Sequence, residues 1–516
     1  MISNGANLAG LLVNTARRLP DAPGLIQGAQ RWTWAELDAR IGAMAFALRD
    51  HCGLSRGDRL LVHAPNCPQM FEIVWACWRL GAVWVPSNVR GTPADLAYMA
   101  ECSGARGLIC DASFPDHADV AAPNLAFRLT IGGHGACDLE TLIAACHGQD
   151  VPLSPVGRDD PAWLFFTSGS TGRPKAAMLT HGQLGFVITN MLADLMPGLS
   201  ERDASLVIAP LSHGAGLHAF VQVARGAVSV LTEGSAFDPA EAWALIERHR
   251  ISNLFTVPTI LNRLVDHPDA ACRDHASLRH VIYAGAPMYL TDQRRALACL
   301  GPVLVQYYGL GEVTGCITVL RPEDHGLPEH EGSCGIARCG MQIEIQDPTG
   351  TPVAIGQTGE ICVAGGAVFS GYLDNPEANA KAFRNGWFRT GDLGHLDQRG
   401  YLYLTGRESD MYISGGSNIY PREIEEALLQ NPAVAEACVF GLPDPEWGES
   451  GVAVLVATPG ATPDICAVRT RLATQIARYK LPRTIVLWDA LPRSGYGKVT
   501  KKDVREEYLR RLEGAE

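Results

Sequence analysis

The sequence lacks the cysteine pattern of a metal-stabilised or disulfide-bonded domain. Fifteen cysteines are present, yet no two form a CxxC pair and no Cys/His cluster has zinc-ligand spacing. Cys67, Cys77, Cys110 and Cys438 stand in apolar runs, where a free cysteine behaves as a small core residue. The odd total indicates reduced thiols and favours a cytoplasmic protein.

The sequence also lacks blocks of like charge and long apolar runs. The net charge of −12 is spread along the chain, which argues against a general nucleic-acid or membrane-surface role. The apolar stretch "LAGLLV" is too short to cross a membrane, and no N-terminal segment has the form of a secretion signal. We therefore expect a cytoplasmic location, no nucleic-acid partner and no membrane insertion.

The first two-thirds of the chain alternate buried strands with helices. A length of 516 residues exceeds one core, so at least two domains are expected. Thr33 and Glu36 form a capping-box pattern before an amphipathic helix, and a second helix is predicted from Pro68 to Leu80. Strands follow at "GDRLLVHAP", "GAVWVPSN" and "ARGLICD". This order predicts βαβ units and mostly parallel sheets.

After about residue 335 the pattern changes to alternating apolar and polar residues between Gly-rich turns, which predicts a β subdomain. A small α+β unit follows, with one helix expected to be capped by Thr462 and Pro463. The fold class is thus α/β, with a large N-terminal domain, a β subdomain and a small C-terminal α+β domain. We place the boundaries at residues 1–406, 407–412 and 413–516.

The stretch "FFTSGSTGRPKAAMLTH", Phe165 to His181, is the first chemical signal. Backbone N–H groups of a Gly-rich loop, with hydroxyls and a lysine, can cradle phosphates. A flexible surface loop is the alternative. Ala176 follows Lys175 where a P-loop needs Ser or Thr, so the P-loop motif is absent.

Seven ordered motifs extend this signal over nearly the whole chain. They are "TSGSTGRPK" (167–175), "PLSHGAG" (210–216), "AGAP" (284–287), "QYYGLGE" (306–312), "WFRTGD" (387–392), "GRESDMYISGGSNIYPREIE" (406–425) and "LPRSGYGK" (491–498). Together they resemble the adenylate-forming superfamily, which includes acyl-CoA synthetases, adenylation domains of peptide synthetases and beetle luciferases. Within it, the chain looks most like aryl- and acyl-CoA ligases.

The resemblance implies an ATP-dependent, AMP-forming acid–thiol ligase that uses ATP, Mg²⁺ and coenzyme A. A carboxylate attacks the α-phosphate of ATP, and a thiol then displaces AMP from the acyl-adenylate. The residues implied for catalysis are Lys498, Glu312, His213 and Thr167, with Glu312 as the Mg²⁺ ligand. The residues implied for nucleotide and coenzyme A binding are Ser168, Gly169, Ser170, Thr171, Gly172, Lys175, Gly285, Ala286, Pro287, Tyr307, Tyr308, Gly309, Asp392, Arg407, Gly415 and Gly416.

Individual roles follow from the same resemblance. Asp392 would accept the ribose hydroxyls, with Arg407 beside it, and Tyr308 would stack on adenine. Lys498 would approach the α-phosphate, and Ser409 would be the hinge of a mobile C-terminal domain. Each residue also has a plainer interpretation from the sequence alone: a turn aspartate, a core tyrosine and a solvated lysine.

The candidate acid pocket is defined by analogy alone. Its walls are Phe186, His213, Ala215, Gly216, Val257, Tyr283, Ala284, Gly309 and Val313. They are apolar or small and show no obvious cation, which favours an aromatic or medium-chain aliphatic acid. Tyr307 stands where malonate-type relatives carry arginine, which disfavours a dicarboxylate, although Arg263 keeps that option open.

Some alternatives and departures remain. His213 and His218 could bind a metal, but no third ligand is near and the Gly-rich sequence is expected to be non-helical. Gly311 replaces a usual threonine, so one hydroxyl to the α-phosphate is lost unless Thr314 or water replaces it. An enzyme that loads an acyl carrier protein and a non-catalytic nucleotide sensor are the alternative functions, and a homodimer is possible.

Overall fold

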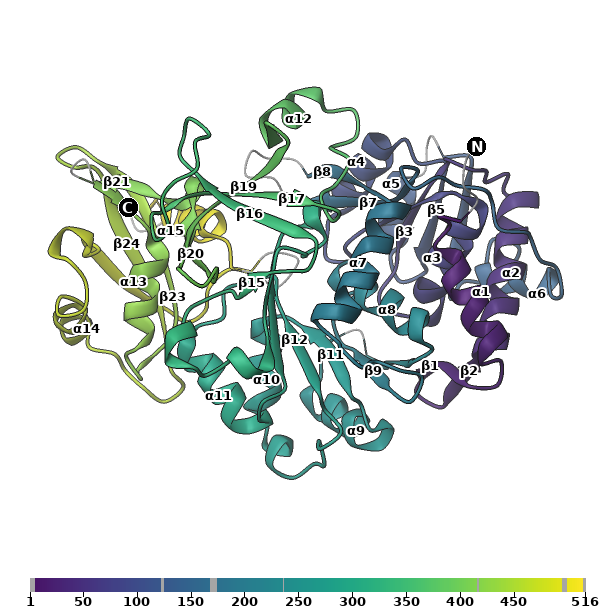
Figure 1. The fold of residues 1–516 in the computed structure, drawn as a ribbon, viewed down its shortest axis with the longest axis horizontal. Coiled ribbons are helices and arrows are strands. Elements are labelled where there is room, and N and C mark those ends of the chain that lie inside the picture. The colour runs from purple at the N-terminus through teal and green to yellow at the C-terminus, as the bar shows by residue number, and fades with distance from the viewer. Residues whose placement is uncertain are drawn as a thin grey trace.

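The computed structural model describes residues 5–121, 125–167, 174–234, 236–414, 417–493 and 499–513. Four β-sheets organise these residues, with helices between them and on their outer faces (Figure 1). The first two sheets are mostly parallel and the third is antiparallel, and all three lie in the larger N-terminal part. The fourth belongs to the C-terminal part, at the yellow-green end of Figure 1.

The largest sheet has nine strands. The six neighbouring strands β13, β12, β11, β9, β10 and β1 are parallel, and the strand pairing at both edges is antiparallel. In spatial order its strands are β15 (Ile336–Ala337), β14 (Thr318–Leu320), β13 (Leu304–Tyr308), β12 (His280–Tyr283), β11 (Asn253–Thr256), β9 (Ala204–Val207), β10 (Val228–Leu231), β1 (Pro23–Gln27) and β2 (Gln30–Thr33).

The second sheet is parallel except for its last strand. In spatial order it contains β6 (Phe127–Ile131), β5 (Gly107–Asp111), β3 (Arg59–His63), β4 (Val83–Pro86), β7 (Pro161–Thr167) and β8 (Lys175–Thr180).

The third and fourth sheets match the predicted β subdomain and α+β unit. The third contains β16 (Met341–Gln346), β17 (Gly359–Gly365), β19 (Trp387–Leu396), β18 (Phe383–Arg384) and β20 (Leu402–Arg407). The fourth contains β22 (Ser417–Ile419), β21 (Tyr412–Ser414), β24 (Gly448–Ala457), β23 (Val434–Asp444) and β25 (Thr484–Trp488). The predicted α/β fold class is confirmed, whereas the domain boundaries stay a prediction.

The helices connect these strands and cover the sheets. They are α1 (Ala9–Arg18), α2 (Trp34–Asp50), α3 (Pro68–Leu80), α4 (Pro93–Ser103), α5 (Pro115–Ala121), α6 (Leu139–Ala145), α7 (His181–Asp194), α8 (Gly214–Arg225), α9 (Pro239–His249), α10 (Pro258–Val265), α11 (Leu290–Leu300), α12 (Pro376–Ala382), α13 (Pro421–Leu429), α14 (Ile465–Leu472) and α15 (Lys501–Glu513).

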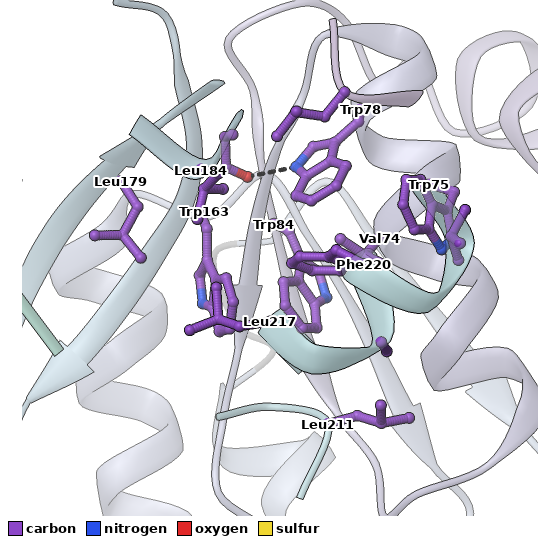
Figure 2. Close-up of a cluster of buried hydrophobic side chains, with 14 of the residues drawn as sticks. Val74, Trp75, Trp78, Trp84, Trp163, Leu179, Leu184, Leu211, Leu217 and Phe220 are labelled. Atoms are coloured by element: carbon purple, nitrogen blue, oxygen red, sulfur yellow. Dashed lines mark hydrogen bonds between the residues drawn. The ribbon is translucent and has the colours of Figure 1, made fainter. Parts of the chain in front are cut away.

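The main core lies between the two large sheets and includes buried residues of α7 and α8. One aromatic part of it joins Trp75 and Trp78 of α3, Trp84 of β4, Trp163 of β7 and Phe220 of α8 (Figure 2). The ring centroids of Trp84 and Trp163 are 4.6 Å apart, and those of Trp78 and Phe220 are 4.7 Å apart. Large rings bury much apolar area, so this cluster fixes β7, at whose end the first functional motif begins.

Local predictions were confirmed at the helix starts. Thr33 and Glu36 make both hydrogen bonds of the capping box, and the second helix runs from Pro68 to Leu80 as expected. A different result holds for α14, which begins at Ile465: its cap is the carboxylate of Asp464, which accepts the Cys466 N–H. Thr462 and Pro463 lie before it, so that predicted cap was wrong.

The expectation that "SHGAGLH" is not helical was also wrong. Helix α8 begins at Gly214, with His213 as its N-cap residue. Glycine is a poor helix former, but burial of most of α8 in the main core outweighs the propensity. Gly216 is required there for space, because a Cβ atom would lie 2.2 Å from the Leu211 carbonyl oxygen.

The C-terminal part has its own cores, formed by residues from Tyr412 to Tyr508. One of them reaches the larger part through Tyr289, the residue before α11, which packs against this cluster. Burial, together with the neighbouring Glu425 and Glu426, raises the pKa of Tyr289 well above its ordinary value. Tyr289 therefore marks a contact between the two parts of the chain.

All fifteen cysteines are free thiols; Cys77, Cys110 and Cys438 are buried as expected, but Cys67 is half-buried and caps α3 by accepting the Met70 N–H at 3.4 Å. Within the described residues, no helix combines the length and the apolar composition that a bilayer crossing needs.

Candidate active site

Glu312 and Thr167 meet at the end of β7. Thr167 is the last residue of that strand, and Glu312 lies in the short 3₁₀ helix Gly311–Val313 that follows β13. The Thr167 hydroxyl donates to Glu312 Oε1 at 2.9 Å, and the Tyr372 hydroxyl donates to the same oxygen at 2.8 Å. Glu312 is buried. Two donors on one oxygen orient this carboxylate and leave Oε2 without a hydrogen bond among the described residues.

Lys175 lies beside this carboxylate cluster. It opens β8, where it pairs with Thr167 across the antiparallel ladder, and its Nζ lies 5.2 Å from the centroid of the Tyr372 ring. Burial and the Glu312 charge raise the pKa of Tyr372, so its hydroxyl stays protonated and donates. An ammonium and an oriented carboxylate therefore lie against one tyrosine.

Asp392 forms a second polar cluster on β19. Its Oδ1 accepts from Arg407 Nε at 3.0 Å, and its Oδ2 accepts from the Tyr308 hydroxyl at 2.6 Å. The Asp392 carboxylate raises the pKa of Arg407, while burial and the same carboxylate raise the pKa of Tyr308. Asp392 is buried, and its side-chain oxygens lie between these two donors.

The two clusters are joined through β13. Tyr308 ends that strand and Glu312 follows four residues later, so the Asp392 and Glu312 clusters lie at the same edge of the nine-stranded sheet. Strand β12 runs parallel to β13, and residues 285–287 follow its end at that edge. Ligands of open α/β sheets bind at the carboxyl ends of the strands, and this edge has that position.

His213 lies close to the Thr167 cluster. Its ring meets the edge of Phe165 at 5.3 Å between centroids, and Phe165 is two residues before Thr167 on β7. The ring nitrogen Nδ1 of His213 is 2.9 Å from the Ser212 hydroxyl. In the described part of the chain, no group of three or more His, Cys, Asp or Glu side chains is arranged to hold a metal ion.

The predicted pocket walls are only partly gathered. Ala215 and Gly216 follow His213 on α8, Val257 precedes α10, and Val313 is buried next to Glu312. Ala284 belongs to the main core, as does Val313, and the ring of Phe186 lies beside Gly340 and Gly366.

Tyr283 separates from this group. It belongs to the core on the other side of the sheet, where its hydroxyl donates to Gln306 at 3.1 Å and accepts from Gln293 at 2.9 Å. Alternate residues of a strand point to opposite faces, so Ile282 faces the main core and Tyr283 does not. Arg263 is also remote, because its guanidinium stacks on Phe237 and donates to the Phe237 carbonyl.

The absent threonine at position 311 has a steric explanation. A Cβ atom on Gly311 would lie 2.6 Å from the Phe165 ring and 2.8 Å from Thr167 Cγ2. Phe165 therefore fills the space that a larger residue would need. Thr314, the suggested replacement, is buried and its hydroxyl donates to the Val313 carbonyl at 2.6 Å.

Several predicted residues cannot be compared with the structure. Ser168, Gly169, Ser170, Thr171, Gly172, Gly415, Gly416 and Lys498 lie outside the described residues. Ser409 is in the short turn Glu408–Asp410 between β20 and β21, in the segment predicted as the hinge. Sequence reasoning missed Tyr372 and Arg338 and gave Phe165 no role of its own; only their contacts reveal these roles.

Two family models together match most of the chain. The model of the AMP-binding enzyme family matches residues 12–373, and that of the AMP-binding enzyme C-terminal domain matches residues 423–498. A feruloyl-CoA synthase of Amycolatopsis sp is 38% identical over 498 residues, covering 96% of this chain and 98% of that protein.

Two further comparisons agree. An indoleacetate–CoA ligase of Aromatoleum aromaticum is 35% identical over 93% of this chain and 94% of its own. The crystal structure of ATP-bound MatB from Rhodopseudomonas palustris is 32% identical and superposes with a TM-score of 0.89 over 98% of this chain and 99% of its own. The chain therefore belongs to the AMP-binding enzyme family of adenylate-forming acid–thiol ligases.

Proposed function

We propose that this enzyme is an AMP-forming carboxylic acid–CoA ligase. In the first step a carboxylate oxygen attacks the α-phosphorus of ATP and pyrophosphate leaves, giving an acyl-adenylate. In the second step the sulfur of coenzyme A attacks the acyl carbon and AMP leaves. The observation that carries the proposal is the pair of buried carboxylates, Glu312 and Asp392, held at one sheet edge by Thr167, Tyr372, Tyr308 and Arg407.

The residues divide the work by charge. Asp392 accepts the ribose hydroxyls, with Arg407 holding the carboxylate in place, and Tyr308 lies against the adenine. Lys175, with the hydroxyls and N–H groups of residues 167–172, neutralises the β- and γ-phosphates. The residues fit Mg²⁺, because Glu312 offers an oriented carboxylate oxygen, and bound Mg²⁺ supplies neutralising charge to the phosphates.

The smaller part of the chain supplies the remaining groups. Lys498 approaches the reacting carboxylate and α-phosphate, and Gly415 and Gly416 line the path of the coenzyme A thiol arm. Residues 413–516 form a mobile domain that turns about Ser409 between the two steps, with residues 407–412 as its hinge. The enzyme acts in the cytoplasm.

The acid is aromatic or a medium-chain aliphatic acid. The candidate walls Ala215, Gly216 and Val313 are small and apolar, and His213 closes the reacting end. Burial of an apolar tail contributes about 0.8 kcal/mol per methylene. The named substrates of the relatives, ferulate and indoleacetate, support this proposal.

Replacing Lys498 by alanine tests the proposal. We expect adenylation, measured as acid-dependent pyrophosphate release, to fall roughly 10²–10³-fold, because one charge-stabilising donor is lost. Thioester formation from supplied acyl-adenylate should persist. Lys502→Ala is the matched control, since Lys502 is an exposed lysine of α15 that pairs with Glu506.

Three results would contradict the proposal. Equal loss of both half-reactions would remove the role of Lys498. Thioester formed on an acyl carrier protein but not on coenzyme A would favour the carrier-loading alternative. Absence of pyrophosphate release with every acid of an aromatic, short-chain and medium-chain panel would favour a nucleotide sensor.

A further inference from the structure

Arg338 is a buried arginine whose donors are unused. Its side chain has no exposed area, and none of its three guanidinium nitrogens makes a hydrogen bond in the described part of the structure. The nearest carboxylate is Asp194, at 3.9 Å from Nε, which is too far for a hydrogen bond. Asp194 Oδ2 already accepts the Cys339 N–H at 2.8 Å.

A guanidinium in this condition is costly. It has five N–H donors, and burial of a charged group without hydrogen-bond partners destabilises the folded protein strongly. The long contact with Asp194 offsets part of the charge and leaves the donors unsatisfied. Buried polar groups without partners are rare in folded proteins, and such a group calls for a functional explanation.

The surroundings of Arg338 belong to the elements of the candidate active site. Its guanidinium carbon lies 5.9 Å from the centre of the Tyr307 ring, and Tyr307 immediately precedes Tyr308, the partner of Asp392. The Arg338 backbone N–H donates to the Ile317 carbonyl at 2.9 Å, which ties it to the segment that follows Glu312.

His218 presents a second pair of unused polar atoms in the same region. Among the described residues, neither of its buried ring nitrogens has a hydrogen-bond partner, and its ring stacks on Phe255 at 4.5 Å and on Tyr307 at 6.0 Å. Burial and the Arg338 charge lower the pKa of His218 to about 3, so the imidazole is neutral and carries one N–H donor.

Helix α8 and a series of ring contacts connect these groups with the reacting end of the site. His213, against Phe165 and near Thr167, is the cap of α8, and His218 is on the first turns of the same helix. The stacked rings of His218, Phe255 and Tyr307 then lead to Arg338. A substrate whose carboxyl lies near Glu312 would extend along these rings toward the guanidinium.

We infer that the acid substrate carries an oxygen acceptor at the end remote from its reacting carboxyl, and that Arg338, with His218 beside it, recognises that oxygen. A second carboxylate and a neutral carbonyl or hydroxyl oxygen share this chemistry. The inference rests on the proposed ligase function, and it makes Arg338 a specificity residue. Tyr307 and Arg263 offer no cation to a charged distal group of the substrate, whereas Arg338 supplies one next to Tyr307.

Matched acids test the inference in the intact enzyme. Acid-dependent pyrophosphate release is measured with cinnamate, 4-hydroxycinnamate and 4-carboxycinnamate, and with hexanoate against adipate. We expect kcat/KM to be about 10²-fold or more higher for the acids with a distal oxygen, because a site built to hydrogen-bond an oxygen rejects analogues that lack it. A larger preference for the carboxylates identifies an anion, and an equal preference identifies a neutral acceptor.

Arg338→Met and the milder Arg338→Lys are then compared with the wild type. Arg338→Met should lower kcat/KM for the distal-oxygen acids about 10²-fold, mainly through KM, and change the unsubstituted acids less than about threefold. Arg338→Lys should keep part of the preference. Arg399→Met is the matched control, because Arg399 is an exposed arginine whose side chain makes a long contact, 3.8 Å, with Glu329.

The outcomes separate the two proposals. Equal loss for all acids in both Arg338 variants, with or without a lower melting temperature, would show a structural role and overturn the inference. A wild-type enzyme that ignores the distal oxygen would also overturn it while leaving the ligase proposal intact. No pyrophosphate release with any acid would instead overturn the ligase proposal, and the inference with it.

Discussion

Gly311 illustrates how one residue of the site depends on another. The family resemblance suggested a missing hydroxyl at this position, whereas the structure shows that Phe165 and Thr167 occupy the space a side chain would need. The glycine and the phenylalanine are therefore a matched pair. Glu312, the next residue, keeps its two hydrogen bonds because this packing is undisturbed.

Restoring the threonine should therefore be harmful. We expect Gly311→Thr to destabilise the protein by about 1–3 kcal/mol, the usual cost of overpacking, and to lower acid-dependent pyrophosphate release. Urea unfolding measures the first effect. The double variant Gly311→Thr with Phe165→Ala frees the space and should recover part of the stability; a fully stable and more active single variant would contradict the packing argument.

The charged residues of the site could be predicted from sequence, and so could their partners Thr167, Tyr308 and Arg407. Glu312, Asp392 and Lys175 stand in motifs that resemble those of the adenylate-forming superfamily, and this resemblance identifies them. Tyr372 and Arg338 lie outside the recognised motifs. The sequence does not indicate that the tyrosine hydroxyl reaches Glu312 or that the arginine is buried. Such contacts are tertiary, and residue types alone do not encode them.

At the scale of elements, α8 shows where sequence patterns fail. Helix α3 was predicted with its correct limits, Pro68 to Leu80, because apolar periodicity and proline mark it. The start of α8 contains two glycines, and propensity argued against a helix. Packing between the two large sheets decided the result, and the close approach of Leu211 explains why glycine stands at position 216.

Two glycine-to-alanine substitutions in helices compare these forces. Gly216→Ala should destabilise the protein by about 2 kcal/mol or more, because the new methyl group meets a backbone oxygen that cannot move easily. Gly185→Ala in α7 should be neutral or stabilising by up to about 1 kcal/mol, since its Cβ would meet only Leu8 Cδ2, at 3.8 Å. Equal melting temperatures for both variants would contradict this explanation of α8.

At the scale of the whole molecule, buried histidines make stability depend on pH. Burial lowers the pKa of His63, His181, His280 and His325 to about 4, and that of His218 to about 3. In the unfolded chain each titrates near pH 6.5. Between that value and about pH 4 the unfolded state binds more protons than the folded state, so stability falls as the pH falls.

The urea midpoint should therefore decrease between pH 7 and pH 5. Each such histidine lowers the free energy of unfolding by about 1.4 kcal/mol for each pH unit below 6.5, down to its folded-state pKa. Replacing one, as in His63→Gln, should therefore reduce the slope of the free energy of unfolding against pH by about that amount. The free energy of each variant is compared with its own value at pH 7. His51→Gln, at an exposed position, is the control. A midpoint that stays constant over this range would contradict the argument.

Tyr289 gives the chain a built-in optical reporter. Its ring is partly buried and packs against the hydrophobic cluster of the C-terminal part, next to Glu425 and Glu426. A movement of the C-terminal part away from Tyr289 would expose the ring further to water. The pKa of the phenol would then fall toward its ordinary value. Ultraviolet difference spectra of tyrosinate, recorded with and without nucleotide, would thus report whether the C-terminal part has moved, without an attached label.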